Sequence, residues 1–208
     1  GIAQDAECYP IKATDLDGIV AFTKTHKVDF AVVTPDDPLV LGLVDELEAV
    51  GIPCFGPHKN AAILEGSKVF SKQLMKKYGI PTAASETFTD ADKAIAYLKN
   101  SAYPAVIKAD GLALGKGVII AQDFSEAEQA VRDIMCDKVF GASGNSILVE
   151  EFLTGPEVSV LSFTDGKTVV PMVSSMDHKR ALTGDKGLNT GGMGTVAPNP
   201  YYTEEVAE

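Results

Sequence analysis

The chain has 208 residues, 45% of them hydrophobic and 23% charged, and a formal net charge of −11. This composition is typical of a globular protein with a substantial core, and the negative charge argues against nucleic acid or an anionic membrane as a partner. No stretch approaches the roughly 20 apolar residues that span a bilayer. Three widely spaced cysteines without a metal-ligand pattern favour a reduced, cytoplasmic setting.

Residues 1–57 predict a short parallel strand–helix–strand unit. Thr14 is expected to cap a first helix, and residues 30–33 to form a buried strand. Residues 38–51 carry apolar side chains at the helical period, between a first-turn proline and a final glycine. A second strand is expected over residues 52–55. This order indicates the tail of a doubly wound domain whose first strand is absent.

The middle of the chain predicts alternating helices and strands. Helices are expected from Ser67 to Tyr78, from a cap at Thr89 through Lys99, and after a capping box that begins at Ser125. Residues 146–150 are expected to form a strand. We expect the compact block of residues 86–150 to be a separate small lid.

The stretch from Val106 to Ile120 predicts a strand, a glycine-rich loop and a second strand. Glycines let backbone amides approach an anion, and Lys108 and Lys116 supply positive charge for a polyphosphate. Only three residues separate Gly111 from Gly115, so this is not a Walker A loop. Because strands flank the loop on both sides, it would close over a nucleotide as a flap. The alternative is an ordinary glycine-rich hairpin with a solvated lysine.

Three further stretches are candidate parts of a site. Lys68 follows a helix start, where a cation is mildly disfavoured unless it reaches a phosphate; otherwise it is a solvated surface lysine. The backbone of residues 150–157 could read an adenine edge, with Glu157 on ribose hydroxyls, or it is a solvated acidic turn. Residues 177–180 mix charges outside any periodic pattern, and the alternative for them is a surface salt-bridge cluster.

The last third of the chain predicts a hairpin followed by a long irregular segment. Residues 157–163 and 167–173 alternate with period two around a turn, which indicates antiparallel pairing. Residues 174–200 leave regular patterning, and loops of that length are usually functional or disordered. His26 and His58 have no sequence partner and are interpreted as surface residues.

Five motifs occur in order: Glu65–Lys68, Val106–Gly111, Gly115–Gly117, Glu150–Leu153 and Asn189–Gly194. Together they resemble the glycinamide ribonucleotide synthetase family of ATP-grasp enzymes, from near Asp29 to the last residue. The resemblance implies an α/β and α+β chain with an ATP-grasp fold and part of a preceding doubly wound parallel-sheet domain. It makes residues 1–57 that remnant, residues 58–85 and 151–208 the central domain, and residues 86–150 the lid.

The resemblance implies an ATP-dependent carboxylate–amine ligase. The family joins glycine to 5-phosphoribosylamine through a glycyl phosphate intermediate and releases glycinamide ribonucleotide, ADP and phosphate, in purine biosynthesis. A carboxylate and ATP repel each other, so lysines and Mg²⁺ must neutralise charge, and the acyl phosphate needs shelter from water under a lid.

The resemblance also assigns roles to residues. The catalytic group is Lys108, Lys116, Asp177 and Lys179. The ATP-binding group is Lys68, Lys108, Gly115, Lys116, Gly117, Glu150, Glu151, Phe152, Leu153 and Glu157. The substrate-binding group is Asp36, Pro38, His178, Asn189, Thr190, Gly191, Gly192, Met193 and Gly194. No metal ligand is implied within the sequence, since the family's magnesium-binding Glu and Asn would lie beyond its last residue.

Two departures from the family pattern affect the substrate side. Asp36 stands where the family typically has glutamate, and Leu188 stands where it typically has proline. For the chain acting alone we expect nucleotide binding without turnover. The alternatives are another ATP-grasp ligase, such as a carboxylase or D-amino-acid ligase, and a non-catalytic nucleotide-binding or assembly module.

Overall fold

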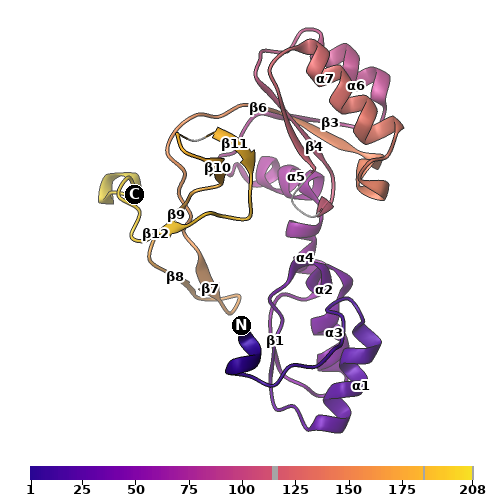
Figure 1. The fold of residues 1–208 in the computed structure, drawn as a ribbon, viewed down its shortest axis with the longest axis vertical. Coiled ribbons are helices and arrows are strands. Elements are labelled where there is room, and N and C mark those ends of the chain that lie inside the picture. The colour runs from indigo at the N-terminus through magenta and orange to yellow at the C-terminus, as the bar shows by residue number, and fades with distance from the viewer. Residues whose placement is uncertain (114–116, 185, 208) are drawn as a thin grey trace. The chain divides into compact units, whose positions relative to one another are not determined.

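The computed structural model describes residues 1–113, 117–184 and 186–207. The chain divides into two compact units, Gly1–Phe152 and Leu153–Glu208, and each is described here by itself (Figure 1). None of the helices in the described ranges is long and apolar enough to cross a membrane.

The first part of unit 1 contains the predicted parallel pair. Its elements are η1 (Ile2–Gln4), α1 (Leu16–His26), β1 (Ala31–Val32), α2 (Asp36–Leu41), α3 (Leu43–Ala49), β2 (Cys54–Phe55) and α4 (Lys59–Gly66). Strand β1 runs parallel to β2, with Ala31 opposite Cys54. Buried Val33, Val44 and Leu47 form the centre of a small core between these elements. The predicted strand–helix–strand unit is therefore confirmed.

Two details of this part differ from the sequence prediction. Asp15, rather than Thr14, caps α1, because its carboxylate accepts a hydrogen bond from the amide of Gly18. The single helix expected over residues 38–51 is two helices, α2 and α3. They separate at Gly42, whose φ of +102° is left-handed and stops the first helix.

The rest of unit 1 is a four-stranded antiparallel sheet with helices. Its elements are α5 (Lys68–Tyr78), β3 (Ser85–Phe88), α6 (Ala91–Leu98), β4 (Ala105–Ala109), β5 (Val118–Ala121), α7 (Phe124–Val131), η3 (Arg132–Cys136), η4 (Gly141–Asn145) and β6 (Ile147–Glu151). The strand order is β3-β6-β4-β5, so β4 and β6 are central. The two strands predicted on either side of the glycine-rich loop are confirmed as antiparallel β4 and β5.

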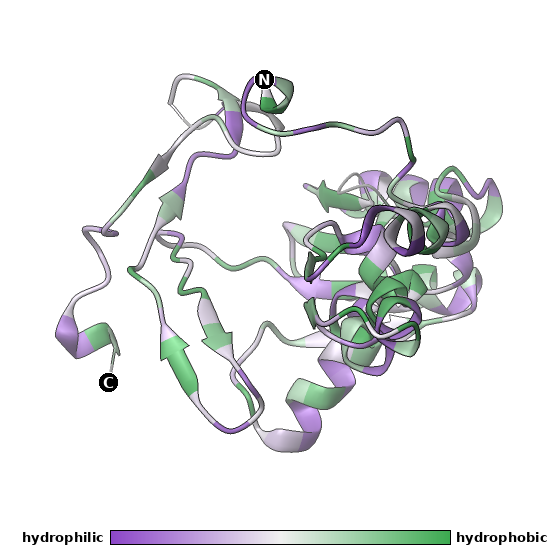
Figure 2. Cartoon of the chain, turned by 90° about the horizontal axis from the view of Figure 1, so that it is seen from below, coloured by the Kyte–Doolittle hydropathy of each residue, from purple (hydrophilic) through white to green (hydrophobic). Residues whose placement is uncertain are grey.

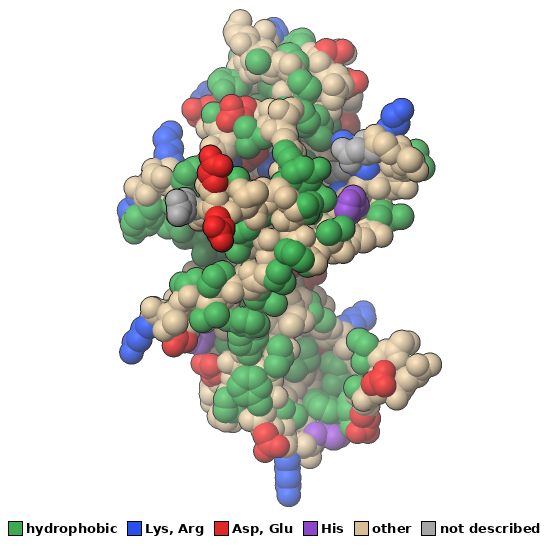
Figure 3. All heavy atoms as spheres, turned by 90° about the vertical axis from the view of Figure 1, so that its left-hand side faces the viewer, with side chains coloured by type: hydrophobic (Ala, Val, Ile, Leu, Met, Phe, Trp, Pro, Cys, Tyr) green, Lys and Arg blue, Asp and Glu red, His purple; other side chains and the backbone are tan. Residues whose placement is uncertain are grey.

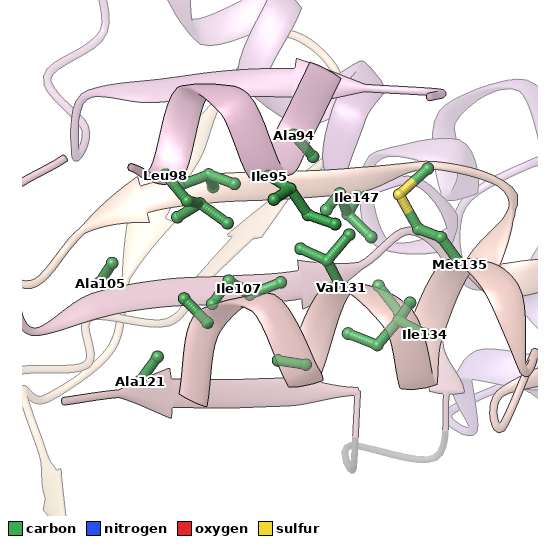
Figure 4. Close-up of a cluster of buried hydrophobic side chains, with 14 residues drawn as sticks. Ala94, Ile95, Leu98, Ala105, Ile107, Ala121, Val131, Ile134, Met135 and Ile147 are labelled. Atoms are coloured by element: carbon green, nitrogen blue, oxygen red, sulfur yellow. The ribbon is translucent and has the colours of Figure 1, made fainter. Parts of the chain in front are cut away.

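One face of this sheet is covered by α6 and α7. Figure 2 shows hydrophilic and hydrophobic residues interspersed along the helices of the chain. Leu98 and Val131 from the helices meet Ile107 and Ile147 from the strands in the main core (Figure 4). Because side chains alternate along a strand, the neighbours of these core residues point to the opposite face. That opposite face carries the candidate site.

Two helices in this part start away from their predicted positions, α6 one residue later and α7 two residues earlier. Asp90 caps α6, where Thr89 was expected, and Asp123 caps α7 through the amide of Glu126. Glu126 returns a bond to the amide of Gln122, so the expected capping box exists but begins two residues before Ser125. A short carboxylate at each true cap position outcompetes the hydroxyl beside it.

Unit 2 consists of short two-stranded ladders. Its elements are β7 (Ser162–Thr164), β8 (Val169–Pro171), β9 (Met176–Asp177), β10 (Arg180–Leu182), β11 (Lys186–Asn189), β12 (Thr195–Val196) and α8 (Glu204–Ala207). The predicted hairpin is confirmed as β7 and β8, but it is shorter than expected. The expected irregular segment instead pairs β10 with β11 and β9 with β12.

Among the described residues of unit 2, only Ser174 and Asn199 are buried. The Asn199 side chain donates to the carbonyls of Glu157 and Ser175 and accepts from the amide of Tyr201. Apolar side chains such as Leu161 stay exposed, and many such side chains are visible in the space-filling view (Figure 3). Polar bonds, not an apolar core, organise this unit.

Candidate functional site

Strands β4 and β6 place a lysine and a glutamate on the face of the sheet opposite α6 and α7. Val106 lies opposite Glu150 in the ladder and Lys108 opposite Leu148, so Lys108 and Glu150 are diagonal neighbours on one face. The Lys108 Nζ lies 2.5 Å from Glu150 Oε2. Glu150 is only 5% exposed, so this is a charge pair largely withdrawn from water.

Helix α5 brings two more lysines to the same place. Ser67 caps the helix by accepting from the amide of Phe70, 3.0 Å away. Lys68 and Lys72 are four residues apart and so lie one above the other on the helix face. The Lys72 Nζ lies 3.0 Å from Glu150 Oε1. The Lys68 Nζ donates to the carbonyl of Gly111 in the glycine-rich loop.

Asp110 ties the end of β4 to the start of α5. Its carboxylate accepts from the Ser67 hydroxyl at 3.1 Å, from the Val69 amide at 3.3 Å, from the Gly111 amide at 3.0 Å and from the Ser146 hydroxyl at 3.2 Å. An acceptor of this kind near a helix N-terminus is also favoured by the helix dipole. Asp110 therefore fixes the position of the N-terminus of α5, which carries Lys68, relative to the glycine-rich loop.

A pocket of about 240 Å³ opens between these groups, and Lys68, Lys72, Lys108 and Glu150 all line it. Burial lowers the pKa of Lys68, against the opposing attraction of Asp110 and Glu65, and Lys108 lowers it further by repulsion. An anionic ligand would stabilise the protonated form of a lysine buried in this way, because the ligand's charge replaces the stabilisation that water gives in solution. The pocket is therefore suited to a phosphate group.

The described ends of the glycine-rich loop are closely packed against each other. Gly111 has φ +86°, a left-handed conformation that favours glycine. A side chain at Gly117 would lie 2.7 Å from Ala113 Cβ, and the Ala109 amide donates to the Gly117 carbonyl at 2.8 Å. Glycine is thus required where the two loop ends approach. The predicted ATP-binding residues Gly115 and Lys116 lie outside the described residues.

The segment expected to hold adenine begins in unit 1. The carboxylate of Glu151 accepts from the Ala84 amide at 2.8 Å, and the Glu151 amide donates to the Ala84 carbonyl at 3.0 Å. A cavity of about 590 Å³ is lined by residues that include Tyr103, Glu151 and Phe152. Leu153 is exposed in unit 2. Adenine binding by this segment stays a prediction.

The predicted site residues of unit 2 form a separate charge cluster. Lys179 Nζ bonds Glu157 Oε1 and lies 3.8 Å from Asp177 Oδ1. The bond to Glu157 raises the pKa of Lys179, and the attraction of Glu157 and Asp177 adds to this rise. Asp177 Oδ1 is buried and accepts no hydrogen bond from the described residues. A cavity of about 460 Å³ is lined by these three side chains and that of His178.

The loop from Asn189 to Gly194 folds back on this cluster through its backbone. The Thr190 amide and hydroxyl both donate to the Lys179 carbonyl, at 2.7 and 2.9 Å. The amide of His178 donates to the Gly194 carbonyl at 2.9 Å, and the Met193 amide donates to the His178 carbonyl at 2.8 Å. The backbone of Asn189 lies in β11, opposite Arg180, while its side chain is outside the described part of the structure.

Gly191 and Gly192 complete this loop. The Gly192 amide donates to the Thr190 hydroxyl at 3.1 Å, and Gly192 has φ +124°. A side chain at Gly191 would meet nothing within 4 Å. The predicted substrate-binding residues of the loop are therefore close to Asp177, His178 and Lys179, and their role in binding substrate stays a prediction.

The other residues singled out from the sequence lie in the first part of unit 1. Asp36 is exposed at the start of α2, but Pro38 is fully buried and its ring packs in the interior. The substrate-binding roles of Asp36 and Pro38 stay predictions. His26 and His58 are exposed, as predicted; His58 bonds Glu48 at 2.8 Å, and His26 stacks on Phe22 with ring centroids 3.9 Å apart.

Lys72 and Asp110 were missed as members of the site. The signal for Lys72 was available, since it stands four residues after Lys68 on a predicted helix. Asp110 stood inside a quoted motif, but only the fold shows that four donors converge on it. Among the residues that the structure describes, no group of three or more His, Cys, Asp or Glu side chains could hold a metal ion.

Comparisons with known proteins agree with the resemblance. Residues 66–208 match the model of the phosphoribosylglycinamide synthetase ATP-grasp (A) domain, and residues 1–65 match that of the N domain. A curated phosphoribosylamine–glycine ligase from Fusobacterium nucleatum is 49% identical over 201 residues, which are 97% of this chain and 47% of that protein. The chain thus spans about half the length of the curated relatives it matches.

Solved structures give the same fold. A phosphoribosylamine–glycine ligase from Thermotoga maritima superposes with a TM-score of 0.74 at 33% identity, covering 93% of this chain and 46% of that one. The biotin carboxylase domain of a Hydrogenobacter thermophilus 2-oxoglutarate carboxylase, solved with MgADP, has a TM-score of 0.70 at 19% identity, with 83% and 40% covered. The ATP-grasp fold prediction is confirmed, and the chain belongs to the phosphoribosylglycinamide synthetase family.

Proposed function

We propose that this chain carries part of the active site of a phosphoribosylamine–glycine ligase. The reaction would join glycine to 5-phosphoribosylamine with ATP, through glycyl phosphate, and give glycinamide ribonucleotide, ADP and phosphate in purine biosynthesis. A cytoplasmic reaction is part of the proposal, supported by three free cysteines in the described structure. The names of the relatives that share about half of their length with this chain support the assignment.

One geometric observation carries the proposal. Lys68 and Lys108 come from different elements, yet both line the same pocket of about 240 Å³. A chain with a net charge of −11 gathers three lysines around this pocket against its overall field. The arrangement favours a polyphosphate, because point charges from separate elements can contact several of its oxygens at once.

The chain's own residues would act mainly by holding and neutralising charge. ATP supplies the phosphoryl group that activates the glycine carboxylate. Lys68 and Lys108 would bind its phosphates and reduce their repulsion of that carboxylate. The sheet of β3, β6, β4 and β5 with its glycine-rich loop would serve as the lid that keeps water away. The cluster of Glu157, Asp177 and Lys179 would contribute to the remaining substrate contacts.

Mg²⁺ belongs to the proposal as the partner of the ATP phosphates, which are its usual ligands in such sites. The residues described here include no group of three or more ligands of their own. No step is therefore assigned to the ion through this chain. The lysines fit the phosphate part of the ligand, which is the part that the pocket can be tested for.

Calorimetric titration of the chain with Mg-ATP tests the proposal. Wild type should bind, and Lys108→Met should weaken binding by about tenfold or more, which corresponds to about 1.4 kcal/mol. Lys76→Met is the matched control, because Lys76 is an exposed lysine of the same helix α5. No detectable binding by wild type, or equal losses in the two variants, contradicts the proposal.

The reaction itself is tested in a protein that carries this chain together with the other half of its relatives' length. Phosphate release should require both glycine and 5-phosphoribosylamine. Bicarbonate and D-alanine are the control acids, because carboxylases and D-alanine ligases are among the structural neighbours. Release with one of these acids and not with glycine would replace the ligase assignment with another.

A further inference from the structure

Glu150 carries two charge partners, and they differ in what else they touch. Its Oε1 lies 3.0 Å from Lys72 Nζ and its Oε2 lies 2.5 Å from Lys108 Nζ. The carboxylate is 5% exposed, so water contributes little to its stability and the two ammonium groups contribute most. Removing both partners would leave a buried charge uncompensated.

The Lys72 ammonium group has three acceptors in the folded chain. Besides Glu150 it donates to the Thr82 hydroxyl at 2.6 Å and to the Ala83 carbonyl at 3.1 Å. An ammonium group has three donors, so these acceptors use its whole capacity. Its side chain is only 14% exposed. A phosphate could accept a hydrogen bond from Lys72 only if Lys72 gave up one of its existing bonds.

The Lys108 ammonium group has fewer partners than that of Lys72 among the described residues. Its ammonium bonds Glu150 and, within the described ranges, no other recorded acceptor. It is 28% exposed and lines the pocket. Lys108 is therefore the member of the pair that is able to turn towards a ligand.

We propose that Lys72 is a positioning residue that frees Lys108 for phosphate binding by remaining bound to Glu150 when Lys108 leaves it. The inference rests on the proposed function, in which a triphosphate occupies this pocket. When Lys108 transfers to a phosphate, Glu150 loses one partner and keeps the other. Without Lys72, Lys108 would be the remaining ion-pair partner of Glu150 among the described residues, and the carboxylate would compete with the phosphate for it.

Two simpler roles for Lys72 make different predictions. If Lys72 merely adds positive charge near the pocket, its loss weakens anion binding by the same factor whether or not Glu150 is charged. If it only stabilises the fold, its loss lowers the unfolding temperature without changing the affinity. The positioning role instead makes the effect of Lys72 depend on the charge of Glu150, which a double-mutant cycle measures.

The experiment titrates inorganic tripolyphosphate with Mg²⁺, a probe without a base or ribose, into wild type and five variants. These are Lys72→Met, Glu150→Gln, the double variant K72M/E150Q, Lys76→Met and Lys108→Met. We expect Lys72→Met to weaken binding about tenfold and Lys76→Met to change it by less than about twofold, where tenfold equals about 1.4 kcal/mol. The double variant should bind as Glu150→Gln does.

Each outcome decides the matter. Equal losses from Lys72→Met in the charged and neutralised backgrounds overturn the inference, as does wild-type affinity in Lys72→Met. If Lys72→Met does not fold, comparison of Glu150→Gln with the double variant still decides it, because the inference requires these two to bind alike. Wild type that binds and is weakened by Lys108→Met, with Lys72→Met unaffected, removes the inference alone. Absence of binding in wild type removes the proposed function as well.

Discussion

The charge of the Lys68 ammonium group depends on what fills the pocket. Burial lowers its pKa below the usual 10.5 despite the attraction of Asp110 and Glu65. The folded state therefore disfavours protonated Lys68 relative to the unfolded chain. This unfavourable contribution is complete below the lowered pKa and disappears as the pH rises through it towards 10.5. An anion bound beside Lys68 opposes the effect of burial and raises the pKa again.

We therefore expect tripolyphosphate to bind with uptake of protons as the pH rises through the lowered pKa of Lys68. Lys68→Met should abolish most of that uptake and weaken binding. Calorimetry in two buffers with different ionisation enthalpies measures the number of protons taken up. In the absence of ligand, the free energy of unfolding of wild type should rise relative to that of Lys68→Met as the pH increases. A proton uptake that is the same in both proteins would falsify this account of the pocket.

Asp110 supports the site by accepting four hydrogen bonds. Asp110→Ala leaves the Ser67 and Ser146 hydroxyls and the Val69 and Gly111 amides without this carboxylate. Because the site is partly open to water, we expect a loss of about 2 kcal/mol in the free energy of unfolding, within the range for unsatisfied buried donors. Urea denaturation measures it. Asp137→Ala, at an exposed position, should change stability by less than about 0.5 kcal/mol and serves as the control.

At the scale of elements, η4 offers a matched pair of glycines. A side chain on Gly144 would lie 2.1 Å from the carbonyl oxygen of Ile134, whereas Gly141 has open space around it and φ +59°. Gly141→Ala should cost about 1 kcal/mol for the left-handed conformation. Gly144→Ala should cost about 3 kcal/mol, because backbone must move. Chemical denaturation of both variants compares them, and equal losses would contradict the packing at Gly144.

The elements show which features the sequence could predict. Long periodic patterns, such as the helix from Lys68 to Tyr78 and the two strands around the glycine-rich loop, were predicted correctly because local side-chain spacing determines them. Helix α4 was missed, since its eight residues show only weak amphipathic patterning. The pairings of β9 to β12 were also missed, because those short strands are specified by bonds between distant residues such as His178 and Gly194.

The candidate site shows the same limit. The types of residue near a phosphate were predictable from lysines and glycines in sequence. The partner that each lysine holds in the folded chain was not, because Lys72 meets Glu150 through the packing of α5 on β6 and Lys108 meets it through the pairing of β4 with β6. Pro38 was predicted to bind substrate on motif resemblance alone; its side chain is buried in the fold, and its role in binding stays a prediction.

At the scale of the whole molecule, the two units differ in how they are stabilised. Unit 1 contains both hydrophobic clusters, whereas the described residues of unit 2 bury only Ser174 and Asn199. Isolated two-stranded ladders are marginally stable in water. A fragment of residues 1–152 should therefore retain a cooperative thermal transition, while a fragment of residues 153–208 should show none. Circular dichroism melting of the two fragments tests this. A cooperative melt of the smaller fragment would contradict it.

The alternation along β4 also has a consequence for inherited change. Ile107 and Ala109 face the helices, and Lys108 between them faces the ligand pocket. Adding or deleting one codon within this strand would exchange the core-facing residues with the pocket-facing residues. The lysine would then lie in the hydrophobic core and the isoleucine at the pocket. A point mutation alters one property at a time, but a length change would damage solubility, folding and ligand capture together. Descendants of this gene should therefore vary in length in the loops on either side and not within these five residues.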